Sequence, residues 1–245
     1  MTPPDKLLVA MATYNERDNL PDMVRQVLAV VPGAELLVVD DNSPDGTGQW
    51  AAEQAAADRR ISCLHRPRKM GLGSATIAAL RHAVQHAYTY VVLLDADGSH
   101  DPREIPQMLE RISSAQAAAP DIVIGSRYVP GGSTIGWPWY RRWMSRSINA
   151  FARLMLGLPV RDCSGAFRCI RVALLERVDL DSIRSHGYAC LEEILWRFKQ
   201  VGARFEEIPI VFANRQRGHS KINTRESLAA LWMLFRLGLR NWFRV

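Results

Sequence analysis

Residues 93–102 read LLDADGSHDP, an apolar run that ends in two carboxylates one residue apart. The apolar part predicts a buried strand, and Asp95, Asp97, Gly98 and Ser99 predict a tight turn after it. Two carboxylates on such a turn can face one side and gather oxygen ligands around a hard divalent cation, for which Mg²⁺ or Mn²⁺ fits best. Mg²⁺ is usually held by one or two carboxylates together with substrate phosphates, which favours a nucleotide diphosphate as the other ligand. A solvated turn is the alternative for a DxD taken alone.

The same arrangement, an apolar run followed by polar residues, recurs before this stretch. Strands are predicted over residues 7–12, 36–40, 61–65, 90–94 and 122–125, and helices over 20–30, 47–57, 74–87 and 102–113. This βαβ alternation indicates an α/β fold with a mostly parallel sheet, in which ligands bind at the carboxyl ends of the strands. The polar stretches TYNE, DDNSPDGT and DADGSH all fall there, so we expect one cleft to collect them.

Beyond residue 125 the alternation stops. Residues 136–158 combine large aromatic side chains with arginines on a helical pattern, which predicts helices at an interface. A helix over 189–201, a strand over 204–209 and the basic loop NRQRGHSK lead to a last helix over 226–244. The expected organisation is one domain over residues 1–225, followed by an amphipathic C-terminal helix over 226–245.

The last helix is apolar over most of its circumference, but Arg236, Arg240 and Arg244 recur every four residues and form one stripe. Trp232, Trp242 and Phe243 are close to these arginines in the sequence, a combination that favours a membrane interface. Packing of a terminal helix into the core is the alternative.

Composition limits the class of protein. The chain has 245 residues, 48% of them hydrophobic, which permits one large α/β domain. A net charge of +6 favours phosphate-bearing partners or an anionic membrane surface, and it is too modest for a nucleic-acid-binding protein. The four cysteines lack CxxC spacing, so we expect reduced thiols in a cytosolic chain. We also expect neither a signal peptide nor a membrane-spanning helix.

Two further groups of residues are candidates for ligand binding. In VVDDNSPDGT a carboxylate can accept hydrogen bonds from a nucleobase or a ribose, although a βα turn would need the same residue types. Arg127 follows a predicted strand, and Arg215, Arg217 and Lys221 lie before the last helix. Such side chains can neutralise a diphosphate or bind a phosphate acceptor, with a solvated basic face as the alternative.

Two weaker patterns are not interpreted as sites. His82 and His86 lie four residues apart on a predicted helix, but no third metal ligand is suggested nearby. GLGSA at residues 71–75 lacks the third glycine of a dinucleotide fingerprint and follows the wrong strand.

The motifs occur in a characteristic order: ATYNERDNLP, VVDDNSPDGT, LLDADGSHDP, GSRYVPGG, GW..RR..SR..N, RDCSGAFR and FANRQRGHSK. With them the chain resembles the dolichol-phosphate mannose synthases, a branch of the family 2 glycosyltransferases. The resemblance covers nearly the whole chain and implies a GT-A-type fold. The implied activity is inverting, metal-dependent transfer of mannose from GDP-mannose to a polyprenyl or dolichyl monophosphate. Relatives often have transmembrane helices, so attachment to the inner face of the membrane would depend here on amphipathic helices or on a separate membrane protein as partner.

The resemblance also implies roles for individual residues. The nucleotide-sugar site would consist of Thr13, Tyr14, Glu16, Val39, Asp41, Asp95, Ala96, Asp97, Arg127, Arg215 and Lys221. Metal ligands would be Asp97, the principal one, with Asp95 and Ser99. Arg127, Arg141 and Ser145 would contact the acceptor phosphate, and Asp97, Arg127, Arg215 and Lys221 would be the catalytic residues. Ala12, Gly98, Cys163 and Ala166 depart from the family pattern without removing a charged group from the chemistry.

Several functions remain open on these residues. The same reaction could use UDP-glucose or another sugar nucleotide, because one sequence does not show the shape of the donor pocket. A sugar-nucleotide pyrophosphorylase would normally need a glycine-rich, lysine-bearing loop, which TYNERDN does not supply. A catalytically idle module that binds a membrane surface is the non-enzymatic alternative.

Overall fold

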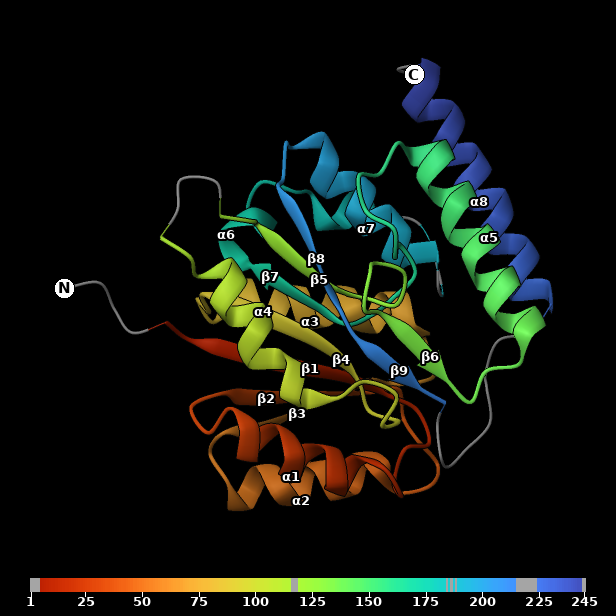
Figure 1. Cartoon of the computed structure of the whole chain (residues 1–245). Helices are drawn as coiled ribbons and strands as arrows, with labels where there is room; N and C mark the ends of the chain where they lie inside the picture. Colours follow the sequence, from red (N-terminus) through yellow and green to blue (C-terminus); the bar gives the residue numbers. More distant parts are fainter. Residues whose placement is uncertain are drawn as a thin grey trace.

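A seven-stranded sheet forms the centre of the molecule (Figure 1). The computed structural model describes residues 5–115, 119–183, 185, 187, 189–214 and 224–243, without the side chains of 224–230 and 243. The strands of this sheet are β1 (Leu7–Thr13), β2 (Glu35–Asp40), β3 (Ile61–His65), β4 (Tyr90–Asp95), β5 (Ile122–Ser126), β7 (Arg168–Arg171) and β8 (Phe205–Pro209). Their order is β3-β2-β1-β4-β7-β5-β8, and only β7 is antiparallel to its neighbours. The predicted α/β class with a mostly parallel sheet is confirmed.

This topology places the ends of four strands at one edge. β1 lies between β2 and β4, and all three run parallel, so the residues after Thr13, Asp40 and Asp95 meet there. β5 runs in the same direction because β7 is antiparallel to both β4 and β5. A small second sheet of β6 (Ser133–Ile135) and β9 (Val211–Ala213) adjoins this edge, where the amide of Ala213 donates to the carbonyl of Ser99 at 3.1 Å.

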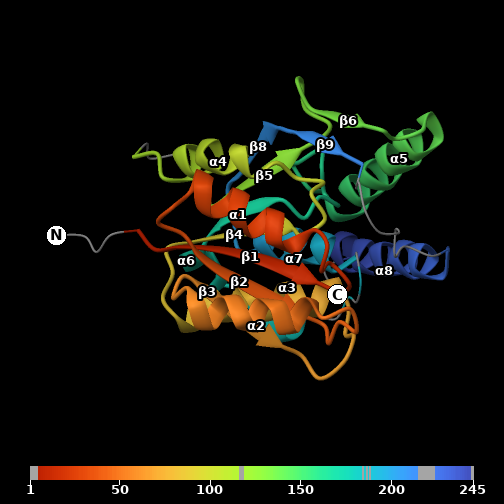
Figure 2. The same cartoon turned by 90° about the horizontal axis from the view of Figure 1, so that it is seen from below.

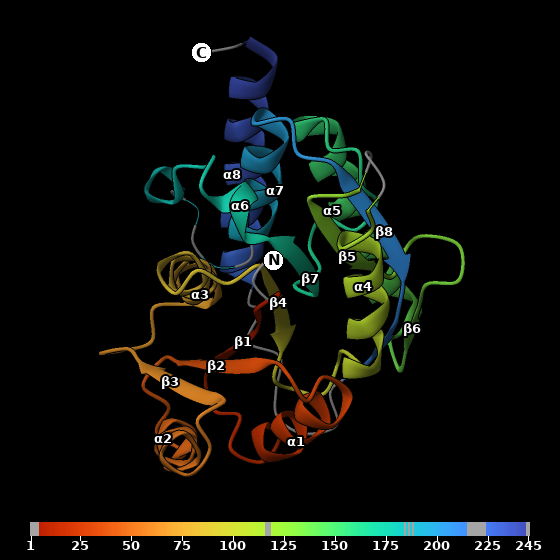
Figure 3. The same cartoon turned by 90° about the vertical axis from the view of Figure 1, so that its left-hand side faces the viewer.

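Helices cover both faces of the sheet, as Figure 3 shows from the side. The helices are α1 (Leu20–Val30), α2 (Thr47–Ala57), α3 (Leu72–Gln85), α4 (Ile105–Ile112), α5 (Trp139–Leu156), α6 (Val172–Leu175), α7 (Ala189–Gln200) and α8 (Thr224–Phe243), with 3₁₀ turns at Pro102–Glu104 and Leu180–Ser182. Successive strand residues point to opposite faces. Leu8 and Ala10 of β1 therefore join a core with α3, α7 and α8, while Val9 and Met11 join a core with α1 and α4.

Two helices project from the body beyond the sheet (Figure 2). α5 begins after Pro138, and it ends at Gly157, whose φ of 61° is a left-handed C-terminal cap. α8 packs alongside α5 (Figure 1) and also contacts α7. Leu234 and Leu237 of α8 are buried in the core, whereas its other face is exposed.

Most predicted elements occur within a few residues of their expected bounds, and the helices over 20–30 and 47–57 have the predicted bounds. The predicted helix over 102–113 is divided, since Pro106 has no N–H to donate and the segment forms a 3₁₀ turn followed by α4. The strands β6, β7 and β9 were not predicted. Among the residues described, no helix is both long and apolar enough to cross a bilayer.

Candidate functional site

A cleft opens where β1, β2 and β4 end. Of the residues predicted for a nucleotide-sugar site, it is lined by Thr13, Tyr14, Glu16, Asp41, Asp95, Ala96 and Asp97. Val39 lies inside β2, fully buried in the core, and does not line the cleft. The parallel sheet thus brings together three polar segments that are up to 84 residues apart in the sequence, between Thr13 and Asp97.

The first wall of the cleft is the TYNE loop after β1, which the loop after β2 holds in place. The amide of Asn15 donates to Ser43 Oγ, and the amide of Glu16 donates to Thr47 Oγ1, both at 3.0 Å. Thr13 Oγ1 donates to Asp40 Oδ1, also at 3.0 Å. These bonds order the backbone beside Tyr14, so the turn residues of DDNSPDGT also have a structural role.

Asp41 organises a third segment, the loop after β3. Its Oδ2 accepts hydrogen bonds from the amides of Met70 at 2.9 Å and Gly71 at 2.7 Å, and its Oδ1 lies 3.1 Å from Arg66 Nη1. This turn requires the φ of 88° at Gly71, a conformation that favours glycine. The first glycine of GLGSA therefore has a structural role that does not depend on binding a dinucleotide. The loop carries Lys69 into the cleft, with Nζ 4.4 Å from the centroid of the Tyr14 ring.

Sequence reasoning missed Lys69 as a cleft residue and Arg66 as the partner of Asp41. Both belong to RPRK, which directly follows β3 at the same edge as the acidic loops. Their position after a predicted parallel strand was the available signal. The proposed contact of Asp41 with a nucleobase or ribose remains a prediction.

The DADGSH turn provides the carboxylates. Gly98 has a φ of 75°, and the amide of Ser99 donates to Asp97 Oδ1 at 3.0 Å, which closes the turn. The side chain of Asp95 is 33% exposed, while Asp97 and Ser99 are buried. Carboxylate and hydroxyl oxygens suit Mg²⁺ or Mn²⁺, so the donor set fits a divalent cation. Within the part of the chain that is described, there is no cluster of three or more His, Cys, Asp or Glu side chains that could hold a metal.

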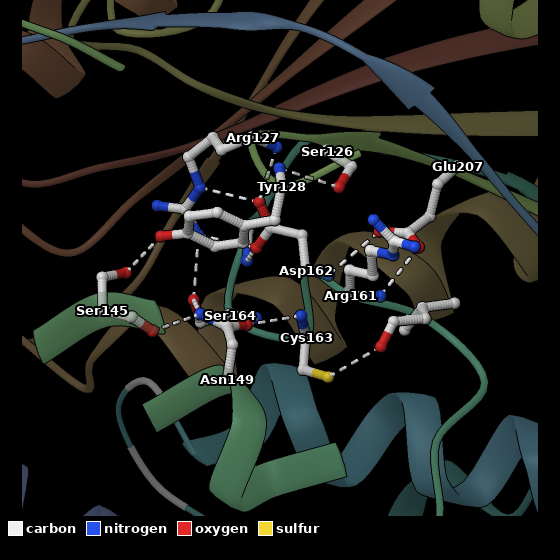
Figure 4. Close-up of polar contacts among 12 residues, drawn as sticks. Ser126, Arg127, Tyr128, Ser145, Asn149, Arg161, Asp162, Cys163, Ser164 and Glu207 are labelled. Atoms are coloured by element: carbon white, nitrogen blue, oxygen red, sulfur yellow. Dashed lines mark hydrogen bonds and ion pairs between the residues drawn. The ribbon is translucent and has the colours of Figure 1, made fainter. Parts of the chain in front are cut away.

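Arg127 is at the same edge, directly after β5, and it is locked to Asp162 (Figure 4). Its Nε donates to Asp162 Oδ2 at 2.7 Å, and its Nη2 donates to Asp162 Oδ1 at 2.6 Å and to Ser164 Oγ at 2.9 Å. Burial alone would lower the pKa of Arg127, but the Asp162 carboxylate outweighs burial and raises it. Arg127 is therefore a fixed positive charge that is partly balanced inside the protein.

α5 is connected to the same network. Asn149 Oδ1 accepts from the amides of Cys163 at 2.7 Å and Ser164 at 3.1 Å, and Tyr128 Oη donates to Ser145 Oγ at 2.6 Å (Figure 4). These contacts bring the predicted acceptor residue Ser145 close to the Arg127 loop. Asp162 and Asn149 were not predicted, although Asp162 belongs to the motif RDCSGAFR.

Arg141, the third predicted acceptor residue, lies near the start of α5. Its guanidinium is 4.1 Å from the centroid of the Trp137 ring, and its Nη1 donates to Asn214 Oδ1 at 3.2 Å. Arg215, Arg217 and Lys221 follow directly in the sequence, but they lie outside the described residues.

Residues 8–179 match the profile of the family described as Glycosyl transferase family 2. An undecaprenyl-phosphate mannosyltransferase of Micrococcus luteus is 40% identical over 247 residues, which cover 96% of this chain and 100% of that protein. A polyprenol monophosphomannose synthase of Mycolicibacterium smegmatis is 39% identical over 239 residues, covering 97% of this chain and 89% of that protein.

Solved structures are similar in fold. Glucosyl-3-phosphoglycerate synthase from Mycobacterium tuberculosis, in complex with Mn²⁺, UDP and glucosyl-3-phosphoglycerate, has a TM-score of 0.69 at 18% identity. The same enzyme with Mn²⁺, UDP-glucose and glycerol 3-phosphate has a TM-score of 0.69 at 17% identity. Both matches cover 97% of this chain and 80% of that chain. At such identities the likeness shows the fold alone, and it confirms the expected GT-A-type fold.

Proposed function

The chain belongs to glycosyl transferase family 2, and from that premise we propose that it transfers mannose from GDP-mannose to a polyprenyl monophosphate. The observation that carries the proposal is the cleft where Tyr14, Asp95 and Asp97 meet, at the same sheet edge as Arg127. Of two relatives at about 40% identity over nearly the full chain, one is named an undecaprenyl-phosphate mannosyltransferase and the other a polyprenol monophosphomannose synthase. UDP-glucose or another sugar nucleotide is the alternative donor.

A divalent cation, Mg²⁺ or Mn²⁺, belongs to this proposal. Asp97 and Asp95 would hold it, with Ser99 as a further ligand, and the bound cation would supply positive charge against the donor diphosphate. The Mycobacterium tuberculosis enzyme of similar fold has structures in complex with Mn²⁺.

The proposed reaction needs charge neutralisation more than it needs a general base. A lipid monophosphate is already ionised near pH 7, so its oxygen can attack the anomeric carbon once repulsion from the donor is reduced. Attack in line with the departing diphosphate inverts the anomeric centre and gives a β-mannosyl phosphate from GDP-α-mannose. The nucleoside diphosphate leaves with the bonding electrons, and Arg215 and Lys221 are proposed to stabilise its charge.

Arg127, Arg141 and Ser145 are proposed to receive the acceptor phosphate. Asp162 and Ser164 occupy Nε and Nη2 of Arg127, which leaves Nη1 to approach a phosphate oxygen. Arg141 adds a second guanidinium at the start of α5, close to Trp137. Because the Asp162 pair fixes Arg127, that charge needs no reorganisation when substrate binds.

The exposed face of α5 and α8 is proposed to attach the protein peripherally to the inner face of the membrane. Large side chains exposed there are Trp139, Tyr140, Trp143, Met144, Leu154, Trp232, Phe235, Leu239 and Trp242. Arg142, Arg146, Arg153, Arg236 and Arg240 lie on the same helices and are exposed. Aromatic and cationic side chains together are typical of surfaces that bind anionic bilayers. A lipid acceptor would then reach the Arg127 side of the cleft along α5.

Transfer from GDP-mannose and from UDP-glucose to a polyprenyl monophosphate in detergent, with Mg²⁺, Mn²⁺ or EDTA, tests the proposal. We expect metal-dependent turnover with GDP-mannose. Turnover with UDP-glucose but not with GDP-mannose would show that the proposed donor is wrong and leave the proposed mechanism intact. No turnover with either donor would favour a catalytically idle membrane-binding module.

Asp97→Asn separates an enzyme from such a module. Loss of a carboxylate at the proposed metal site should reduce turnover by about 10²-fold or more, while vesicle binding persists. Asp22→Asn, which removes an exposed carboxylate on α1, is the matched control and should retain activity. Full activity of the Asp97 variant would rule out the metal assignment.

A further inference from the structure

His100 ends the turn that bears the acidic pair, and nothing in the proposed chemistry assigns it a role. Its Nδ1 accepts a hydrogen bond from the amide of Asp95 at 3.3 Å. The same nitrogen lies 3.6 Å from Asp95 Oδ2, a distance that is too long for a hydrogen bond. The imidazole therefore connects the last residue of the turn to the backbone of its first residue, Asp95.

Packing fixes the orientation of the imidazole ring. His100 is only 3% exposed, and its ring centroid is 5.1 Å from that of Phe167 and 5.1 Å from that of Phe212. Phe212 belongs to β9, and the amide of the following residue, Ala213, donates to the carbonyl of Ser99 at 3.1 Å. The turn is thus held from the β9 side at two successive positions, Ser99 and His100.

The hydrogen bond from Asp95 also fixes the tautomer of His100. The neutral ring has one N–H, and a hydrogen bond from Asp95 to Nδ1 assigns that proton to Nε2.

Phe212 also connects this ring to the acceptor side. Its ring centroid lies 5.3 Å from the Arg127 guanidinium carbon and 5.4 Å from the ring centroid of Trp137. His100 and Arg127 therefore pack on the same aromatic side chain, with the acidic turn on one side and the Asp162 network on the other.

We infer that His100 is a positioning residue, which holds the Asp95–Asp97 turn in the shape that a metal–diphosphate ligand requires by accepting the Asp95 N–H at Nδ1. The inference rests on the proposed function for the identity of that ligand, but the hydrogen bond itself can be tested without it. His100 touches neither donor nor acceptor in this assignment; it acts through Asp95.

The first test is the ¹⁵N NMR spectrum of histidine-labelled protein at pH 7, with the His100 signals assigned by their absence in His100→Asn. We expect a proton on Nε2 and none on Nδ1. An Nδ1–H tautomer or a charged imidazolium would overturn the inference, whatever reaction the enzyme catalyses.

The second test compares His100→Asn with His100→Gln. The Asn amide oxygen can stand near the position of Nδ1 and accept from Asp95, whereas the Gln amide reaches toward the position of Nε2. Mn²⁺ binding in the presence of GDP, measured by electron paramagnetic resonance, should weaken about tenfold or more in His100→Gln and stay within about threefold of wild type in His100→Asn. Equal affinities in both variants, whether retained or lost, would overturn the inference.

Circular dichroism melting of both variants is the control for correct folding. If His100→Gln does not fold, His100→Asn decides alone: retained Mn²⁺ affinity supports the inference, and weakened affinity in the folded variant overturns it. Absence of Mn²⁺ binding in the wild-type chain would overturn the proposed metal site, and the requirement for a metal-binding shape with it, while the NMR result would still decide the hydrogen bond.

Discussion

At the scale of single residues, the site depends on buried charges that have specific partners. Arg127 with Asp162 and Arg66 with Asp41 are almost completely buried ion pairs beside the cleft. The Arg127–Asp162 pair has the more hydrogen bonds of the two, because Asp162 Oδ2 also accepts from the backbone amide of Arg127 at 3.0 Å. Removing one member of such a pair leaves the other charge buried without compensation.

Asp162→Asn should therefore lower the free energy of unfolding by about 3–5 kcal/mol, as measured by urea denaturation. Asp181→Asn is the matched control, since its ion pair with Arg81 is exposed and should contribute only about 0–1 kcal/mol. A loss below about 1 kcal/mol in Asp162→Asn would mean that Asp162 does not balance Arg127.

The sequence predicted the residues of the cleft better than the contacts between them. Resemblance identified Tyr14, Asp95 and Asp97, and the parallel sheet brings them to one cleft. The partnership of Arg127 with Asp162 was not predicted, because two positions 35 apart carry no pattern that reveals a shared hydrogen bond. Residue types alone therefore indicate which side chains line the cleft, but not which partners hold the charged side chains in place.

At the scale of elements, α8 is both a packed helix and an exposed one. Asn241 Oδ1 accepts from Trp196 Nε1 at 3.1 Å, and Trp242 Nε1 donates to the carbonyl of Met155 at 3.0 Å. A Cβ added at Gly238 would lie 2.9 Å from the Cβ of Met155, so the glycine permits close approach of α8 to α5. Packing into the core, one of the two alternatives considered for this helix, is therefore confirmed for one face, and a membrane interface at the exposed face stays a prediction.

Gly238→Val should lower the free energy of unfolding by about 1–3 kcal/mol through overpacking, although valine is the better helix former. Urea denaturation measures the loss, and Leu239→Ala, at the exposed neighbouring position, should change the free energy by no more than about 0.5 kcal/mol. An unchanged Gly238→Val variant would mean that α8 does not pack tightly on α5 at this position.

The exposed face of α5 should contribute to membrane binding. Replacing Trp139 and Trp143, which are 75% and 68% exposed, with serine should weaken sedimentation with anionic vesicles by roughly tenfold, because each indole loses apolar burial in the bilayer. Leu64→Ser, at an exposed apolar position on β3, is the control. Unchanged binding of the double variant would place the membrane contact elsewhere.

Elements with strong periodicity were predicted, and short ones were not. β7 has only four residues, RCIR, and two of them are arginines, so its sequence does not look like a central strand. Yet Arg168 is fully buried, with Nη1 and Nη2 donating to the carbonyls of Leu191 and Cys163. Tertiary hydrogen bonds therefore outweigh the local signal that a sequence pattern can provide.

At the scale of the whole molecule, stability should depend on the pH of the surroundings. Burial raises the pKa of Glu192 from 4.5 to about 7, even though Arg168 lowers it. Because the folded pKa exceeds the unfolded one, the contribution of this group to stability is complete below about pH 4.5 and is lost as the pH rises through about 7.

Glu192→Gln should remove this dependence. Between pH 5 and pH 8 the free energy of unfolding of the wild-type chain should fall relative to that of the variant by an amount on the order of 3 kcal/mol. Urea denaturation at both pH values measures the difference, with Glu53→Gln as the exposed control. Parallel pH profiles of wild type and Glu192→Gln would show that Glu192 titrates normally.

The antiparallel strand in the middle of the sheet also has a consequence for the nascent chain. β4 is made early, but its second neighbour in the sheet, β7, leaves the ribosome more than 70 residues later, on the order of ten seconds at typical rates of synthesis. β5 waits even longer for its other partner, β8. During translation the strands that bear the TYNE, DDNSPDGT and DADGSH loops can therefore assemble first, with β4 as an open edge, and the part of the sheet that supports Arg127 closes last.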